Sequence, residues 1–322
     1  MKNATKKNKF FAVTAGDAVI DKISYVETYP QRGTKINVID QMLDIGGTAA
    51  SAASTLSNLG INTSFIGSWG NDVYGNIIDM FFEFKKISVR KNIVPETPIN
   101  NVYIDLQYKS RTIYKTKKQK IVYPDSYLIN IFKADIILLD REDSNLLSLI
   151  LANKKRTTKI IIDTSTYVTP ETIKLFINAD YSVVPFEFVV NWDLNESFAQ
   201  NLQKLNEMKD EFWVTAGDKG CMKICRGKVY YYPTLQTKVI DTLGAGDVFR
   251  AGFIYAALNN FNDKEIGMFA NSTALVQCLS RGNCLASPSL HEVMKVYKKM
   301  TKIQEQIFSL KDVINISQFN FI

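Results

Sequence analysis

The 322-residue sequence contains one histidine, His291, which removes histidine-based catalytic triads and metal sites with several histidines from consideration. It also has few cysteines, and none of them form a CxxC pair. Neither a zinc site nor a disulfide framework is therefore indicated, and we expect buried or incidental free thiols. The cysteines are Cys221, Cys225, Cys278 and Cys284.

Long hydrophobic runs are lacking as well. No stretch approaches the roughly 18 apolar residues of a membrane span. The apolar residues 10–15 are too few for the core of a signal peptide, which takes about 7–15. We therefore expect a cytoplasmic protein that does not bind membranes.

The sequence also has no basic run interleaved with aromatic residues, so we expect no binding to nucleic acid. The net charge of +7 comes partly from a basic N-terminal tail, and the rest is scattered. The 46% hydrophobic and 22% charged residues are ordinary for a globular protein. The length allows one large α/β domain with an appendage, or two modest domains.

Short apolar segments alternate with helical ones along most of the chain, which predicts an α/β fold with a mostly parallel central sheet flanked by helices. The expected strands are residues 10–16, 63–67, 134–139, 159–162, 181–184 and 212–214. Helices are expected at residues 46–60, 77–84 and 248–258.

Residues 23–43 and 93–122 interrupt this alternation with Val, Ile, Tyr, Thr and Lys in alternating patterns. They read as exposed antiparallel strands that would form a small β-sheet lid over an active site. The same sheet could instead pair with that of a second subunit in a homodimer, and the sequence leaves both options open. We place the main domain at residues 10–295, lid included, and a C-terminal helix and tail at residues 296–322.

Residues 241–249 read Asp-Thr-Leu-Gly-Ala-Gly-Asp-Val-Phe and carry the most information. Gly244, Ala245 and Gly246 would form the first turn of the helix, where unpaired N–H groups and the helix dipole attract an anion. Asp247 would then be a carboxylate beside an anion site, which suits a general base. The alternative is an ordinary helix start with an acidic residue in its first turn.

The same string resembles the C-terminal signature of the ribokinase-like (PfkB) carbohydrate kinases. Three earlier elements resemble that family in the right order, at residues 15–21, 46–75 and 214–220. The resemblance covers residues 10–295. It implies a ribokinase-like fold that transfers phosphate from ATP, with Mg²⁺, to a hydroxyl group of a sugar.

The resemblance also implies roles for individual residues. Those that would contact the sugar are Asp21, Gly46 and Gly47. Those on the nucleotide side would be Thr215, Gly217 and Gly220, together with Gly244 and Gly246. Asp241, with Leu243, matches positions that in some members bind a monovalent cation such as K⁺, although Asp241 could simply shape its loop.

Three positions depart from the family pattern. Ser51 stands where many members have an asparagine that contacts the sugar, and a hydroxyl cannot supply both the donor and the acceptor of an amide at that reach. Phe186 and Val189 stand where an Asn-x-x-Glu motif orders magnesium-bound water, which leaves Glu187 as the acid nearby. The resulting string resembles a ketohexokinase-like branch, so we expect a ketose-type or related substrate.

Further polar residues could reach the pocket. Arg111 in the lid and Glu142 after a strand end are candidates for substrate binding. Arg250 lies on the same helix face as Asp247 and would contact phosphate or pair with an acid at the surface. Two other functions remain open: a nucleoside kinase, and a non-catalytic protein that binds a ligand or partner through the same fold.

Overall fold

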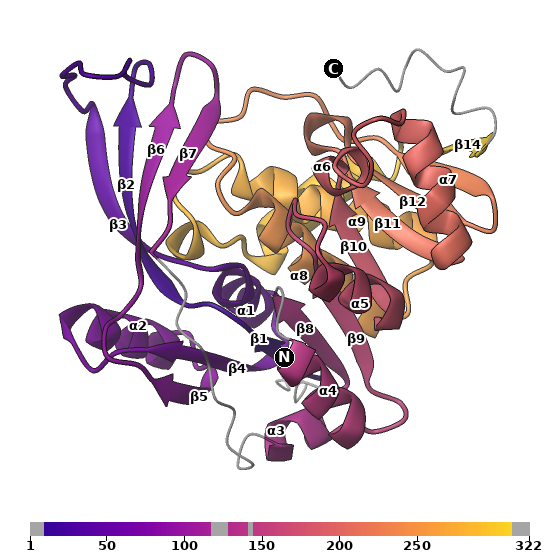
Figure 1. Cartoon of the computed structure of the whole chain (residues 1–322), viewed down its shortest axis with the longest axis horizontal. Helices are drawn as coiled ribbons and strands as arrows, with labels where there is room; N and C mark the ends of the chain where they lie inside the picture. The colour runs from indigo at the N-terminus through magenta and orange to yellow at the C-terminus, as the bar shows by residue number, and fades with distance from the viewer. Residues whose placement is uncertain (1–9, 117–127, 141–143, 311–322) are drawn as a thin grey trace, which may run out of the picture.

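The computed structural model describes residues 10–116, 128–140 and 144–310, and its main body is a ten-stranded sheet between layers of helices (Figure 1). The strand order is β14-β13-β12-β11-β10-β9-β8-β1-β4-β5. Its strands are β1 (Phe11–Ala15), β4 (Asn62–Trp69), β5 (Ser88–Ile93), β8 (Ile136–Asp140), β9 (Lys159–Asp163), β10 (Tyr181–Pro185), β11 (Glu211–Thr215), β12 (Cys221–Cys225), β13 (Lys228–Tyr232) and β14 (Gln306–Ser309).

The strands from β5 to β11 in this order are parallel, and β12, β13 and β14 extend the sheet in antiparallel fashion. This confirms the predicted α/β architecture. The helices are α1 (Thr48–Asn58), α2 (Val73–Phe84), α3 (Leu128–Lys133), α4 (Ser144–Asn153), α5 (Pro170–Asn178), α6 (Phe186–Val190), α7 (Phe198–Met208), α8 (Ala245–Leu258), α9 (Asp263–Gln277) and α10 (Leu290–Met300). None of the helices in the described ranges is long and apolar enough to cross a membrane.

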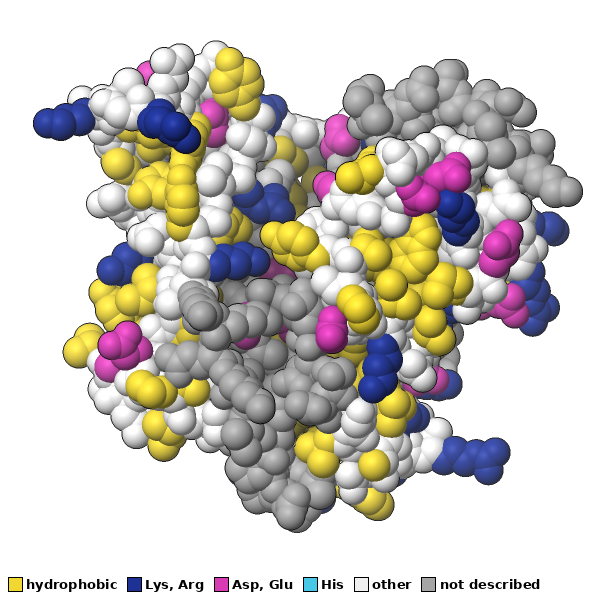
Figure 2. Space-filling view, viewed as in Figure 1, with side chains coloured by type: hydrophobic (Ala, Val, Ile, Leu, Met, Phe, Trp, Pro, Cys, Tyr) yellow, Lys and Arg dark blue, Asp and Glu magenta, His cyan; other side chains and the backbone are white. Residues whose placement is uncertain are grey.

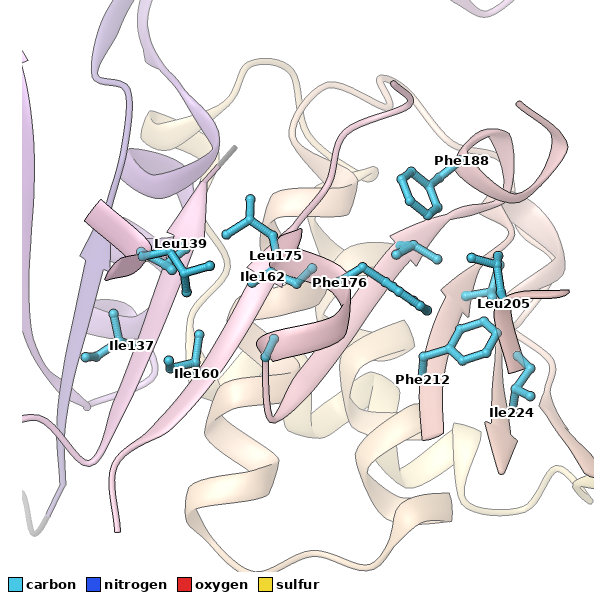
Figure 3. Close-up of a cluster of buried hydrophobic side chains, with 14 of the residues drawn as sticks. Ile137, Leu139, Ile160, Ile162, Leu175, Phe176, Phe188, Leu205, Phe212 and Ile224 are labelled. Atoms are coloured by element: carbon cyan, nitrogen blue, oxygen red, sulfur yellow. The ribbon is translucent and has the colours of Figure 1, made fainter. Parts of the chain in front are cut away.

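Both faces of the sheet are buried along its central strands, which explains why strands such as β8 are largely apolar. Ile137 and Leu139 of β8 pack on one side with residues of α4, α5 and α7 (Figure 3). Ile136 and Leu138, the alternate residues of β8, pack on the other side with α1, α8 and α9. Successive side chains of a strand point to opposite faces, so a strand covered on both sides needs an unbroken apolar run.

The second sheet has the order β3-β2-β6-β7 and stands apart from the body in Figure 1. Its strands are β2 (Val19–Val26), β3 (Asp40–Gly46), β6 (Ile99–Asp105) and β7 (Ser110–Tyr114). The β2–β3 and β6–β7 pairs are antiparallel as predicted, but β2 and β6 are parallel. A parallel pair needs a long crossover, and here the chain runs through α1, β4, α2 and β5 before it returns.

The end of the chain differs from the expected helix and tail. The helix starts earlier, at Leu290, and Gln306–Ser309 forms strand β14, which pairs with β13 at the edge of the main sheet. Four residues carry too little alternation to be recognised as a strand. The proposed boundary between residues 295 and 296 stays a prediction.

Candidate active site

Asp247 lies in the first turn of α8, next to the carboxyl ends of strands β8 and β9. Those strands end in Asp140 and Asp163, which are paired in the sheet register. Both carboxylates are close enough to Asp247 to raise its pKa. The carboxyl edge of a parallel sheet is where ligands of such folds bind, so Asp247 lies at the expected place.

The pKa of Asp247 is raised from 3.8 to about 7. The main cause is burial, although the side chain keeps partial contact with solvent, and repulsion from Asp163 adds to it. Arg250 and a hydrogen bond from the Thr48 side chain act in the opposite direction. A carboxylate with this pKa is suited to accept a proton near neutral pH.

Arg250 is buried beneath this turn. Its Nη2 atom lies 2.6 Å from Asp163 Oδ1, and its Nη1 atom donates a 2.9 Å hydrogen bond to the carbonyl oxygen of Gly246. Arg250 does pair with an acidic residue, as one of the two hypotheses expected. That hypothesis placed the pair at the surface and is wrong on this point, because the Arg250–Asp163 pair is buried. Since the guanidinium group holds both Asp163 and the Gly246 carbonyl, it fixes the turn relative to the sheet.

The turn before α8 is shaped by Gly244, which has a φ of 73°. A Cβ atom at this position would overlap the side-chain oxygen of Asn283, so glycine is needed for both conformation and space. Val248 is the first residue whose N–H group bonds inside the helix, to the Gly244 carbonyl at 2.9 Å. The Ala245 N–H group makes a long bond of 3.3 Å to Thr242, and those of Gly246 and Asp247 precede the helix ladder.

Asp21 and the paired glycines meet where strand β3 leads into α1. Asp21 lies in β2, is 4% exposed, and accepts a 2.9 Å hydrogen bond from Asn100 Nδ2. A Cβ on Gly46 would overlap the Asp21 carboxylate, and one on Gly47 would overlap the Asp17 carbonyl. Burial raises the pKa of Asp21. The predicted sugar-binding residues are thus brought together, and their role stays a prediction.

Asn283 was missed in the sequence and lies at the centre of this region. Its Oδ1 atom accepts a 2.7 Å hydrogen bond from Ser51 Oγ, and its side chain also hydrogen-bonds Asp21. The backbone N–H of Asn283 is held by the buried carboxylate of Asp44 at 2.5 Å. An amide side chain therefore lies beside Ser51, and it comes from a residue 232 positions further along the chain. No local pattern marks it.

The residues predicted for the nucleotide side lie at the turn between β11 and β12. Thr215 ends β11, and Gly217 begins a short 3₁₀ helix, Gly217–Lys219. A Cβ on Gly217 would meet nothing within 4 Å, whereas one on Gly220 would overlap the Tyr232 carbonyl. Gly220 is thus required by the packing of the hairpin, and Gly217 leaves an open approach.

Glu187 is exposed in the first turn of α6, directly after β10. Phe186 stacks on Phe198 with ring centroids 4.5 Å apart, and Val189 is fully buried. The side chains of Phe186 and Val189, which depart from the family motif, therefore pack α6 against the apolar core. Glu187 lies at the carboxyl edge of the sheet.

Asp241 is buried and surrounded by hydrogen-bond donors. Its Oδ2 atom accepts from the Tyr25 hydroxyl at 2.9 Å and from the Gly282 N–H at 3.3 Å, and its Oδ1 accepts from the Leu243 N–H at 2.9 Å. The carboxylate thus joins strand β2 of the small sheet to the loop before α8. This favours the loop-shaping role over the cation-binding one.

Arg111 of β7 reaches the same loop, with its Nη1 atom 3.2 Å from Thr242 Oγ1. A pocket of about 350 Å³ lies here between the β6–β7 hairpin and residues 238–242. Arg111 therefore contacts the loop next to the active site, and its role in binding substrate stays a prediction. Glu142 lies outside the described residues.

Comparisons with known proteins bear on the family and the fold of this chain. Residues 9–290 match the model of the pfkB family of carbohydrate kinases. A nucleoside kinase from Methanocaldococcus jannaschii is 24% identical over 296 residues, which cover 88% of this chain and 95% of that protein. The structure of a putative ribokinase from Agrobacterium tumefaciens matches with a TM-score of 0.79 at 22% identity, covering 92% of this chain and 99% of that one. Arabidopsis thaliana ribokinase, complexed with ribose and ATP, matches with a TM-score of 0.76 at 24% identity, covering 89% and 98%.

Proposed function

Because this chain belongs to the pfkB family of carbohydrate kinases, we propose that it transfers the γ-phosphoryl group of ATP to a hydroxyl group of a sugar or sugar derivative, with Asp247 as the general base. The observation that carries this proposal is the position of Asp247, in the first turn of α8 beside the carboxyl ends of β8 and β9, where its pKa is raised to about 7. In the reaction, the sugar oxygen forms a bond to the γ-phosphorus, and the bond from that phosphorus to the β-phosphate oxygen breaks. ADP leaves, and the hydroxyl proton passes to Asp247.

The Gly244–Gly246 turn would stabilise the charge on the transferred group. Its backbone amides lie at the positive end of α8, and α1, whose first residue Thr48 hydrogen-bonds Asp247, begins beside it. Two helix N-termini therefore act on the same point. Since Arg250 holds the Gly246 carbonyl from below, these groups are fixed before the substrates arrive.

We infer that Mg²⁺ arrives with ATP, as the family resemblance implies. No cluster of three or more metal-ligating side chains exists in the part of the chain that the structure describes. This suits Mg²⁺, which keeps several waters and binds through one or two carboxylates and substrate phosphates. Glu187 would hold it through water. When bound, the ion neutralises phosphate charge.

The nucleotide would lie along the β11–β12 turn, with Thr215, Gly217 and Gly220 beside it, as the family resemblance implies. The open side of Gly217 supports this placement. The sugar would lie between the two sheets, where Asp21, Asn100 and Asn283 form a connected set of carboxylate and amide groups. Such groups recognise hydroxyls by accepting and donating together. We propose a ketose-type or related substrate.

A nucleoside kinase is the second candidate, supported by the M. jannaschii relative. The non-catalytic alternative was motivated by Ser51, Phe186 and Val189. It is weakened because Asn283 supplies an amide beside Ser51 and because the base and its turn are both in place.

The small sheet would serve as the lid of this site and as a dimer contact. Hydrophobic side chains are exposed on this part of the molecule (Figure 2). Leu43 of β3 is 48% exposed, and Ile39, just before β3, is 57% exposed. We propose a homodimer through this surface. The free cysteines fit a reducing compartment such as the cytoplasm.

The test is ADP release with magnesium-ATP over ketoses, aldoses, sugar acids, amino-sugar adducts and nucleosides. We expect turnover on one sugar class, reduced by about 10²–10⁴ in Asp247→Asn. Turnover on nucleosides alone would favour the second candidate. Near-normal turnover of the variant would show that Asp247 is not the base.

A further inference from the structure

Three backbone carbonyl groups converge on the side chain of Gln277, the last residue of α9. Its Nε2 atom lies 2.9 Å from the Gly282 oxygen, 3.2 Å from the Asn283 oxygen and 3.5 Å from the Leu243 oxygen. Gln277 is fully buried. The carbonyls come from the loop that precedes α8 and from the loop that follows α9, so this one amide group joins the two loops beside the active site.

The chemistry of this point is that of a cation site. Carbonyl oxygens that point at one place carry partial negative charge, and they need either a cation or hydrogen-bond donors there. The amide NH₂ group supplies two hydrogens. The opposite orientation of the amide would place the Gln277 oxygen against all three carbonyls, so the arrangement itself determines which atom faces them.

This orientation of the amide has a cost, because it leaves the oxygen of Gln277 without a partner among the described residues. The Gln277 Oε1 atom is buried and has no hydrogen-bond partner in the ranges that the structure describes. An unsatisfied buried amide oxygen is unfavourable, and it is retained here while the nitrogen serves the carbonyls.

The carboxylate next to this point already accepts hydrogen bonds from protein groups. Asp241, which the family resemblance offers to a monovalent cation, accepts hydrogen bonds from Tyr25, Leu243 and Gly282. Arg281 lies over the Tyr25 ring, 4.7 Å from its centroid, and its Nη1 atom pairs with Asp40 Oδ2 at 2.7 Å. The residues present therefore do not fit K⁺: the carbonyl of Leu243 and the carboxylate of Asp241 both have protein partners.

We propose that the side-chain amide of Gln277 takes the place of a monovalent cation beside the Gly244–Gly246 turn, so that this chain organises the turn without K⁺. Because the amide is covalently attached, the turn is held at any salt composition. A cation would have to displace the amide from all three carbonyls before it could bind. The activity part of this inference rests on the proposed kinase function, and the stability part does not.

The experiment compares the full chain in potassium chloride and in choline chloride at equal ionic strength, with two readouts: thermal unfolding and ADP release. For the wild type we expect the same melting temperature in both salts and turnover that agrees within about twofold.

Two variants at the same position separate loss of the amide from loss of volume. Gln277→Ala removes the amide and opens space, so its melting temperature and turnover should fall in choline and recover in part with K⁺. Gln277→Met fills the space but has no hydrogen-bond donor. Its melting temperature and its turnover should therefore both fall, and neither should recover when K⁺ is added. Asn271→Ala is the matched control: Asn271 is a buried amide of the same helix that bonds the Tyr232 carbonyl, and its loss should bring no response to K⁺.

The proposal would be overturned if the wild type melted at a clearly higher temperature in potassium chloride than in choline chloride. A wild-type turnover several-fold higher in potassium chloride would overturn it as well. A folded Gln277→Ala variant that ignores K⁺ in both readouts would overturn it too. If Gln277→Ala does not fold, the wild-type comparison decides alone. Absence of turnover in every salt would contradict the kinase function, and the melting temperatures would still decide on the amide.

Discussion

Replacement of Asp247 by Asn should make the protein more stable at the same time as it removes activity. The pKa of this carboxyl is raised from 3.8 to about 7, chiefly by burial. A raised pKa means that the folded state holds the proton more tightly than the unfolded chain does. The stability that this proton contributes is complete at low pH and is lost as the pH rises from about 4 to about 7.

The size of the effect follows from the shift. A pKa difference of one between the folded and unfolded states corresponds to about 1.4 kcal/mol of unfolding free energy. The difference of about three for Asp247 therefore sets an upper limit of about 4 kcal/mol on the stability lost near pH 8. The side chain keeps partial contact with solvent, which reduces the expected value to about 2 kcal/mol. Asparagine has the same shape without the charge, so Asp247→Asn should avoid this loss.

The assay is urea unfolding of the wild type and of Asp247→Asn at several values between about pH 5 and pH 8. The difference in unfolding free energy should grow in favour of the variant as the pH rises. For the wild type, kcat/KM should fall as the pH drops below about 7, because the base is then protonated. Glu207→Gln, an exposed acid on α7, is the control and should show no trend. A constant difference between Asp247→Asn and wild type would refute the reasoning about burial.

The remaining predictions concern four other places. Arg250→Met should destabilise the fold by about 3–5 kcal/mol, since it leaves Asp163 buried without its arginine partner. Urea unfolding measures this loss of stability, and a loss below about 1 kcal/mol would contradict the prediction. Gly46→Ala should raise the KM for the sugar at least tenfold with the KM for ATP unchanged, because its Cβ would overlap the Asp21 carboxylate. Steady-state kinetics in both substrates check this prediction. Equal changes in both KM values would argue against it. Gly217→Ala should do the reverse and raise the KM for ATP alone. Leu43→Asp should turn a dimer into a monomer in sedimentation analysis, and an unchanged mass would remove the lid as the contact.

Local sequence patterns predict the framework of the site. Asp247 follows Gly244-Ala245-Gly246 directly, and the apolar periodicity of the next residues predicts the helix that α8 proves to be. Strands β1, β4, β8, β9, β10 and β11 were recognisable for the same reason, because burial on both faces demands apolar runs. The outer strands β5, β12, β13 and β14, which include polar or exposed residues, were not expected from the sequence. These features are local, because each depends on neighbours within a few turns or a single strand.

Tertiary structure alone decided which side chains complete the site. Asn283 meets Ser51 across 232 positions, and Tyr25 meets Asp241 across 216. The amide of Gln277 faces carbonyls from two loops, and no spacing in the chain announces that they converge. Such contacts are set by how the small sheet, α1 and the loop after α9 pack together. A single sequence contains periodicity and turn chemistry, but distances between remote residues exist only after the chain has folded.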